Sequence, residues 1–246
     1  MRRRLEGKAA LVTGASRGIG RGIAAAFLSE GASVFICARG DEELRRAASE
    51  LEETAGRSGA VSYRAADVSD PEDAERLVRS AVDRFPDLGI LVNNASILGR
   101  RTPLADLDIA TWDEVLRVNC SSIFYVTRPL IPYLVRRGEG SIINVSSSVG
   151  RKGKANWGAY AVSKFGLEGF TQVLAAELEA SSVRVNSVNP GATRTDMRAE
   201  AYPQEDPATL PTPEEISEVF VYLASDESRG VTGRAFEARD YSKARS

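Results

Sequence analysis

The sequence predicts an α/β fold in which one parallel β-sheet carries helices on both faces, in a three-layer, doubly wound arrangement. Short apolar runs typical of buried strands alternate with longer amphipathic segments along the whole chain. Strands that are separated by helices pair in parallel through right-handed crossovers. Because no internal repeat, linker or low-complexity stretch interrupts the alternation, we expect about seven strands in a single domain over residues 1–246.

The first half of the chain contains four strand-like runs, at residues 9–12, 33–38, 60–66 and 89–93. One helical pattern follows the first run through Leu28, a second is predicted over residues 41–56, and a third starts at Asp70. Asp41 and Asp70 are suitable N-cap residues, and Pro71 is favoured at the first position of a helix.

The second half continues the alternation with longer segments. The predicted elements are a helix from Thr111 towards Pro132, a strand at 141–145, a long helix over 157–180, a strand at 183–188, a helix over 213–224 and a short strand at 232–237. The stretch at 192–213 is rich in Pro, Thr, Asp and Glu and lacks periodicity, which is typical of a mobile segment over a binding site.

Composition excludes several classes of function. The net charge of -2 gives no electrostatic reason to expect nucleic acid or an anionic membrane as a partner, and no apolar run suits a signal peptide or membrane anchor. The chain has no histidine, and Cys37 and Cys120 lie far apart in apolar segments, so we expect no metal site and a reducing, cytoplasmic location. Any general acid or base must then be a carboxylate, Lys, Tyr or Cys.

A glycine-rich turn follows the first strand, with the sequence Thr-Gly-Ala-Ser-Arg-Gly-Ile-Gly at residues 13–20. A strand, a glycine turn and a helix together aim free backbone N–H groups and a helix dipole at a phosphate. Gly14 suits the tight turn, Gly18 a close backbone approach, and Gly20 the contact of helix with strand. The alternative interpretation is a glycine turn that binds no ligand.

Arg39 follows the second strand and indicates which dinucleotide would bind. An acidic residue near the end of this strand would hydrogen-bond the adenosine ribose and repel a 2′-phosphate, whereas an arginine accommodates that phosphate. Arg17 adds a second cation in the glycine turn. These residues predict NADP(H) rather than NAD(H), with a plain surface charge at Arg39 as the alternative.

Tyr160 and Lys164 lie four positions apart in the long predicted helix, so their side chains share one face. A fixed positive charge favours the phenolate and lowers the pKa of a tyrosine, which would let the phenol exchange a proton with a carbonyl or alcohol oxygen. The alternative is a half-buried aromatic residue beside a solvated lysine. The first interpretation is favoured because the glycine turn and several polar residues all follow strand ends and should meet in one crevice. Those residues are Arg39, Asp67, Asn94, Ser147 and Pro190.

With these motifs in place, the chain resembles the short-chain dehydrogenase/reductase family over nearly its whole length. The resemblance rests on the glycine turn, Asp67, the Asn93-Asn-Ala95 motif, Asn119, the serine after the fifth strand, Tyr160-x-x-x-Lys164 and Pro190-Gly191. It is strongest to single-domain, NADP-using members with oxoacyl-reductase-like motifs. It implies a Rossmann-type fold. The predicted helices at residues 112–126 and 157–178 have apolar faces that could pair with a second copy of the chain, so we expect a homodimer or homotetramer.

The resemblance also implies a role for each matched residue. Tyr160 would be the proton donor or acceptor, and Lys164 would lower the pKa of Tyr160 and hold the nicotinamide ribose. A serine would polarise the substrate oxygen. Ser146 and Ser148 are the alternatives to Ser147 for this role; side chains alternate in extended chain, which sets Ser147 apart from the other two, and the family spacing to the tyrosine favours Ser147. Asn119 would support a water-linked proton relay; from the residues alone it is equally a satisfied core amide. The implied cofactor-binding residues are Gly14, Ser16, Arg17, Gly18, Ile19, Gly20, Arg39, Asp67, Val68, Asn94, Ala95, Tyr160, Lys164, Pro190, Gly191, Thr193 and Thr195.

Two positions depart from the family pattern. Ser96 stands where the family usually has glycine, so the backbone after Ala95 is expected to differ. The chain end lacks the usual Val-Asp-Gly-Gly sequence of the oxoacyl reductases, which weakens the case for that substrate and for the usual C-terminal tetramer contact.

The expected activity is NADP(H)-dependent hydride transfer between the cofactor and a small ketone or aldehyde, or the corresponding secondary alcohol. Two alternatives stay open. One is an NADP(H)-binding sensor or scaffold without turnover, and the other is an epimerase or dehydratase on the same scaffold.

Overall fold

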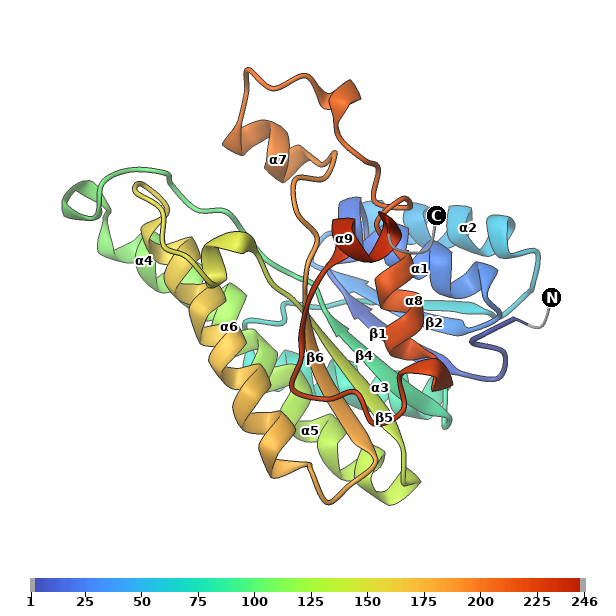
Figure 1. Ribbon diagram of the computed structural model, residues 1–246. Coiled ribbons are helices and arrows are strands. Elements are labelled where there is room, and N and C mark those ends of the chain that lie inside the picture. The colour runs from blue at the N-terminus through green and yellow to red at the C-terminus, as the bar shows by residue number, and fades with distance from the viewer. Residues whose placement is uncertain (1–2, 244–246) are drawn as a thin grey trace.

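Seven parallel strands form one sheet in the computed structural model, which describes residues 3–243 (Figure 1). Their order across the sheet is β3 (Val61–Ala65), β2 (Ser33–Ala38), β1 (Ala9–Thr13), β4 (Leu88–Asn93), β5 (Gly140–Val145), β6 (Val183–Asn189) and β7 (Ala235–Glu237). Every neighbouring pair is parallel. The predicted doubly wound α/β fold is confirmed. Residues 1, 2 and 244–246 of the expected domain lie outside the described part.

Helices cover both faces of this sheet (Figure 1). One layer contains α1 (Gly18–Ser29), α2 (Asp41–Ala55) and α8 (Glu218–Ala224), and the other contains α3 (Pro71–Arg84), α5 (Ser122–Arg137) and α6 (Gly158–Glu177). Within β1, Ala10 and Val12 face the first layer, whereas Ala9 and Leu11 face the second. A strand buried on both faces needs apolar residues at every position, which is why β1 reads as a continuous apolar run.

The helix predicted from Thr111 is longer than expected and is interrupted. It consists of α4 (Ile109–Leu116), a π-helical turn (Arg117–Ser121) and α5. Such turns are rare inside α-helices and often occur at functional sites. This turn contains Asn119.

The segment over residues 192–213 contains two short helices that the sequence analysis did not predict, α7 (Asp196–Ala201) and a 3₁₀ turn (Pro207–Thr209). Both short helices begin at a polar capping residue. The Thr195 hydroxyl accepts a hydrogen bond from the Arg198 backbone amide, and the Asp206 carboxylate accepts one from the Ala208 backbone amide. Helices this short show no apolar period, so their only sequence signal is the cap.

The chain end also differs from expectation. Regular helix in α8 begins at Glu218 rather than at residue 213, because the preceding residues form a turn in which Ser217 donates to the Pro213 carbonyl. After the short β7, the chain continues into α9 (Ala238–Lys243). The remaining 3₁₀ turns are Leu104–Asp106, Ser148–Gly150 and Asp226–Ser228.

The direction in which strands are added reverses between β1 and β4. Residues following the carboxyl ends of these strands therefore diverge to opposite sides and leave a crevice between them. Among residues 3–243, no helix combines the length and the apolar character needed to cross a bilayer.

Candidate active site

A cavity of about 600 Å³ lies over the carboxyl ends of the strands, on both sides of the reversal point. This volume is within the range of pockets that enclose small organic ligands. Most of the predicted cofactor residues line it: Gly14, Ser16, Arg17, Gly18, Ile19, Arg39, Asp67, Val68, Asn94, Ala95, Tyr160, Lys164, Pro190 and Thr195. Distant parts of the sequence therefore meet in one crevice.

Two glycines allow the turn after β1 to pack closely against its neighbours. Gly14 has a φ of +64°, and a Cβ there would lie 2.8 Å from the Ala95 Cα. A Cβ on Gly20 would lie 2.5 Å from both the side-chain nitrogen of Asn94 and the carbonyl oxygen of Gly14. Gly20 does not line the cavity, so its contribution is the close contact of α1 with this turn.

The turn is held in place by Thr13 and Asn94. The Asn94 side-chain amide donates to the carbonyls of Thr13 at 2.8 Å and Gly14 at 3.0 Å. The Thr13 hydroxyl accepts hydrogen bonds from the backbone amides of Asn94 at 3.0 Å and Ala95 at 3.1 Å. Thr13 is not among the predicted site residues, although its hydroxyl at the end of an apolar strand is a sequence signal for such a role.

Charged residues gather at the end of the cavity formed by the turn and β2. Arg17 and the exposed Arg39 line it, and Arg17 pairs with Asp196 of α7 at 3.1 Å. Asp67 is held as a carboxylate: burial acts to raise its pKa, but hydrogen bonds from Ser69 and the charge of Arg39 lower the pKa overall. The pair of arginines supplies the cations that a phosphate needs.

Tyr160 and Lys164 reach the cavity from one face of α6, as the four-residue spacing predicted. Tyr160 is 9% exposed and Lys164 is 3% exposed. The Lys164 Nζ donates to the Val145 carbonyl at 2.8 Å and lies 5.6 Å from the centroid of the Tyr160 ring. The lysine is thus a buried cation and not the solvated side chain of the alternative interpretation.

Burial dominates the protonation of both side chains. It raises the pKa of Tyr160 to about 12, and a hydrogen bond with the Ser147 hydroxyl opposes this rise only in part. The direction is opposite to the expected one, in which Lys164 lowers the pKa of Tyr160. Burial also lowers the pKa of Lys164 to about 8, although the charge of Glu168 favours the ammonium. The Tyr160 phenol is therefore protonated at neutral pH.

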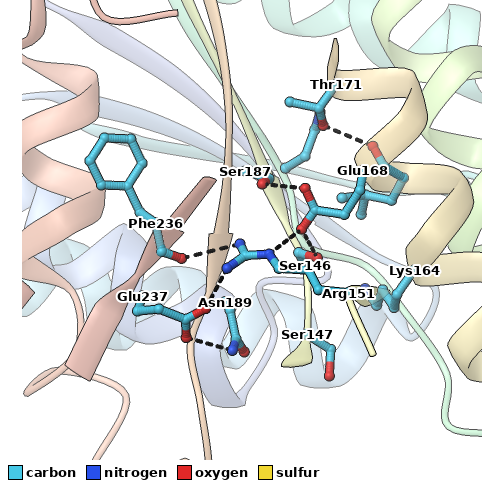
Figure 2. A network of polar contacts seen from close by, with 12 residues as sticks. Ser146, Ser147, Arg151, Lys164, Glu168, Thr171, Ser187, Asn189, Phe236 and Glu237 are labelled. Carbon is cyan, nitrogen blue, oxygen red and sulfur yellow. Dashed lines mark hydrogen bonds and ion pairs between the residues drawn. The ribbon is translucent and has the colours of Figure 1, made fainter. Parts of the chain in front are cut away.

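The three serines after β5 have different surroundings. Ser146 is buried and donates to Glu168 at 2.5 Å, whereas Ser148 is exposed (Figure 2). Ser147 lies on the other side of the chain from Ser146, as alternation in extended chain predicts. Its hydroxyl accepts a bond from the Val149 amide at 3.4 Å and is hydrogen-bonded to the Tyr160 phenol. Of the three, Ser147 is therefore the serine that shares the site of Tyr160.

Asn119 is 1% exposed and does not line the cavity. Its Oδ1 accepts from the Ile97 amide at 2.8 Å, and its Nδ2 donates to the Ile97 carbonyl at 2.8 Å and to the Ser163 hydroxyl at 3.2 Å. Ser163 in turn donates to the Tyr160 carbonyl at 2.7 Å. Both polar atoms of the amide are thus engaged, and Asn119 joins the loop after β4 to the helix that carries Tyr160.

The remaining predicted residues follow β6 or β4. Gly191 and Thr193 do not line the cavity; the Gly191 amide donates to Asn189 at 3.0 Å, and the buried Thr193 hydroxyl donates to the Pro190 carbonyl at 3.3 Å. Ser96 lines the cavity without a positive φ, so a serine fits there without backbone strain.

Comparison with known proteins agrees with this geometry. Residues 8–206 match the family model of the short chain dehydrogenases. The uncharacterized oxidoreductase YciK of Escherichia coli K12 is 42% identical over 229 residues, covering 93% of this chain and 90% of that protein. The 3-oxoacyl-[acyl-carrier-protein] reductase FabG of Thermotoga maritima is 38% identical, covering 94% of this chain and 96% of that protein.

Two solved structures are similar to this chain in both sequence and fold. A Shigella flexneri 2a protein complexed with NADP superposes with a TM-score of 0.92 at 41% identity, covering 97% of this chain and 100% of that one. An Escherichia coli CFT073 protein complexed with NADPH gives a TM-score of 0.92 at 41% identity, covering 97% of this chain and 99% of that one. The family match, the relatives and the fold agree, so this chain belongs to the short chain dehydrogenase family.

Proposed function

We propose that residues 1–246 form one domain that catalyses NADP(H)-dependent hydride transfer between the cofactor and a small ketone or aldehyde, or the corresponding secondary alcohol. One observation carries this proposal. A buried tyrosine that is hydrogen-bonded to a serine stands next to a buried lysine in a cavity that extends to a glycine turn and two arginines. This arrangement would combine proton transfer to oxygen with dinucleotide binding in one site.

The residues of the cavity suit NADP(H). The turn after β1 offers backbone amides at the start of α1, and its glycines leave space where a Cβ would collide with neighbouring backbone. Arg17 and Arg39 would bind the 2′-phosphate, and Lys164 would bind the nicotinamide ribose. The NADP and NADPH complexes of two structures that are 41% identical support the same cofactor here.

When bound, NADPH supplies the hydride for the carbonyl carbon. Tyr160 donates its phenolic proton to the carbonyl oxygen, and Ser147 donates a hydrogen bond to the same oxygen, where negative charge develops. Burial raises the pKa of Tyr160 to about 12, so the phenol is protonated at neutral pH and holds the proton that it would donate. Asn119 does not line the cavity, so its proposed contribution is to position the Ile97 loop against α6.

A second copy of the chain is the proposed protein partner. Large apolar side chains are exposed on the two adjacent helices α5 and α6: Phe124, Val162, Phe165 and Val173 are 45–58% exposed. Apolar faces of this kind are typical of surfaces that another protein covers. We propose a homodimer or homotetramer in which these helices pair with their counterparts.

A panel of small ketones and aldehydes with NADPH deuterated at C4 of the nicotinamide tests the activity. We expect NADPH consumption with at least one compound and deuterium on the carbinol carbon of its product. NADPH binding without consumption across the panel would favour the sensor or scaffold. Turnover of an alcohol epimer or a dehydration substrate with no deuterium in the released product would favour the other alternative.

A further inference from the structure

Glu168 places a buried carboxylate on α6, one turn beyond Lys164 (Figure 2). Tyr160 lies one further turn back on the same helix. It is 8% exposed. The hydroxyl of Ser146 donates to it at 2.5 Å and that of Ser187 at 2.7 Å, so residues from the ends of β5 and β6 both hold it. A carboxylate removed from water is stable as an anion only with donors of this kind.

Arg151 extends this contact to the last strand. Its Nε lies 3.1 Å from Glu168, and its guanidinium also pairs with Glu237 of β7 (Figure 2). The side-chain Nδ2 of Asn189 donates to Glu237 at 2.7 Å, and its Oδ1 accepts a hydrogen bond from the backbone amide of Gly191 at 3.0 Å. The atypical chain end thus supplies an acid that holds the turn after β6, which carries the cavity residue Pro190.

The titratable and charged groups around Lys164 come from several elements. Tyr160 lies on its own helix, Cys120 on the π-helical turn and Arg151 after the 3₁₀ turn that follows β5, while the nearby groups of β5 and β6 are neutral. Burial raises the pKa of Cys120 and of Tyr160, so both are uncharged at pH 8. Among these described groups, Glu168 is therefore the anion that opposes the loss of the lysine proton.

We propose that Glu168 is a positioning residue whose negative charge keeps Lys164 in its ammonium form and whose hydrogen bonds fix the ends of β5 and β6 around the cavity. The inference rests on the proposed function, because the ammonium matters where Lys164 binds the cofactor ribose. Glu168 acts through Lys164, Ser146 and Ser187 and does not reach the reacting atoms.

Replacement of Glu168 by glutamine separates the charge from the shape. The amide oxygen of Gln can still accept from a serine, so the volume and part of the hydrogen bonding are kept while the negative charge is lost. A residue with only a packing role would leave the titration of Lys164 unchanged in this variant. The matched control is Glu177→Gln, which removes an exposed carboxylate from the same helix.

The test is the titration of Lys164 in the free protein, followed by NMR with lysine labelled with ¹³C at Cε. The chain has five lysines, and Lys164→Arg assigns the signal. We expect the midpoint to fall by at least about one pH unit in Glu168→Gln and to stay unchanged in Glu177→Gln. An unchanged midpoint in a folded Glu168→Gln protein would overturn the inference.

Arg151→Met gives a second and opposite measurement, which also serves if Glu168→Gln does not fold. It removes a cation that lies against Glu168 and leaves the carboxylate in place, so the Lys164 midpoint should rise. A fall in this variant would contradict the inference. Neither titration needs cofactor or turnover, so a protein that fails to bind NADPH would refute the proposed function while these results still decide the role of Glu168.

Discussion

Lys164→Met should make the protein more stable while impairing its function. The fall in the pKa of Lys164 from 10.5 to about 8 means that burial of its charge costs about 3 kcal/mol at neutral pH, since each pKa unit corresponds to about 1.4 kcal/mol. Methionine avoids this cost but also loses the hydrogen bond to the Val145 carbonyl, which lowers the gain in stability by about 1 kcal/mol. We expect a net increase of about 2 kcal/mol in the free energy of unfolding at pH 7.

The pH dependence of this gain has a definite sign. Because the pKa is lower in the folded protein, the unfolded chain holds more protons between pH 8 and pH 10.5, and the stability of the unmutated protein rises over this range. The advantage of Lys164→Met should therefore be largest below pH 8 and should shrink towards pH 10.5.

Urea unfolding at pH 7 and pH 10 measures both effects, with Lys152→Met as the control because Lys152 is exposed. NADPH binding by Lys164→Met should be weaker than that of the unmutated protein at pH 7. A variant that is no more stable at pH 7, or one whose advantage persists unchanged at pH 10, would refute the account of Lys164 as a buried cation.

Three further substitutions test other parts of the site. Arg39→Asp should shift cofactor preference towards NADH, with a loss of roughly tenfold or more in NADPH affinity, and equal use of both cofactors by the unmutated protein would count against the role of Arg39. Gly20→Ala should lower the free energy of unfolding by about 1–3 kcal/mol and weaken NADPH binding, because its Cβ would collide with Asn94; thermal unfolding and cofactor titration measure this. Ser147→Ala should reduce the turnover number by about 10²-fold with the carbonyl compound that the protein reduces best, whereas exposed Ser148→Ala should leave it unchanged. Equal losses in the two serine variants would contradict the assignment of Ser147.

The fold could be predicted because its signals are local. Buried parallel strands such as β1 are continuous apolar runs, and Asp70 with Pro71 marks a helix start that the structure shows. The short helix α7 could not be predicted, because a helix of six residues has no apolar period.

The site could be predicted only in part, because the burial of its side chains depends on contacts between distant parts of the sequence. The four-residue spacing placed Tyr160 and Lys164 on one face of α6, but it could not show how deeply the fold buries them. The direction of the Tyr160 pKa was therefore predicted wrongly. Glu168 gave no signal of its own, because a charged residue in a helix usually faces solvent and its partners come from other parts of the sequence.

Comparison of Tyr160→Phe with the unmutated protein tests the central claim most directly. Phenylalanine keeps the ring and removes only the hydroxyl that donates the proton. We expect NADPH to bind with nearly unchanged affinity and the turnover number for carbonyl reduction to fall by at least about 10²-fold. Turnover that survives this substitution undiminished would show that Tyr160 is not the proton donor.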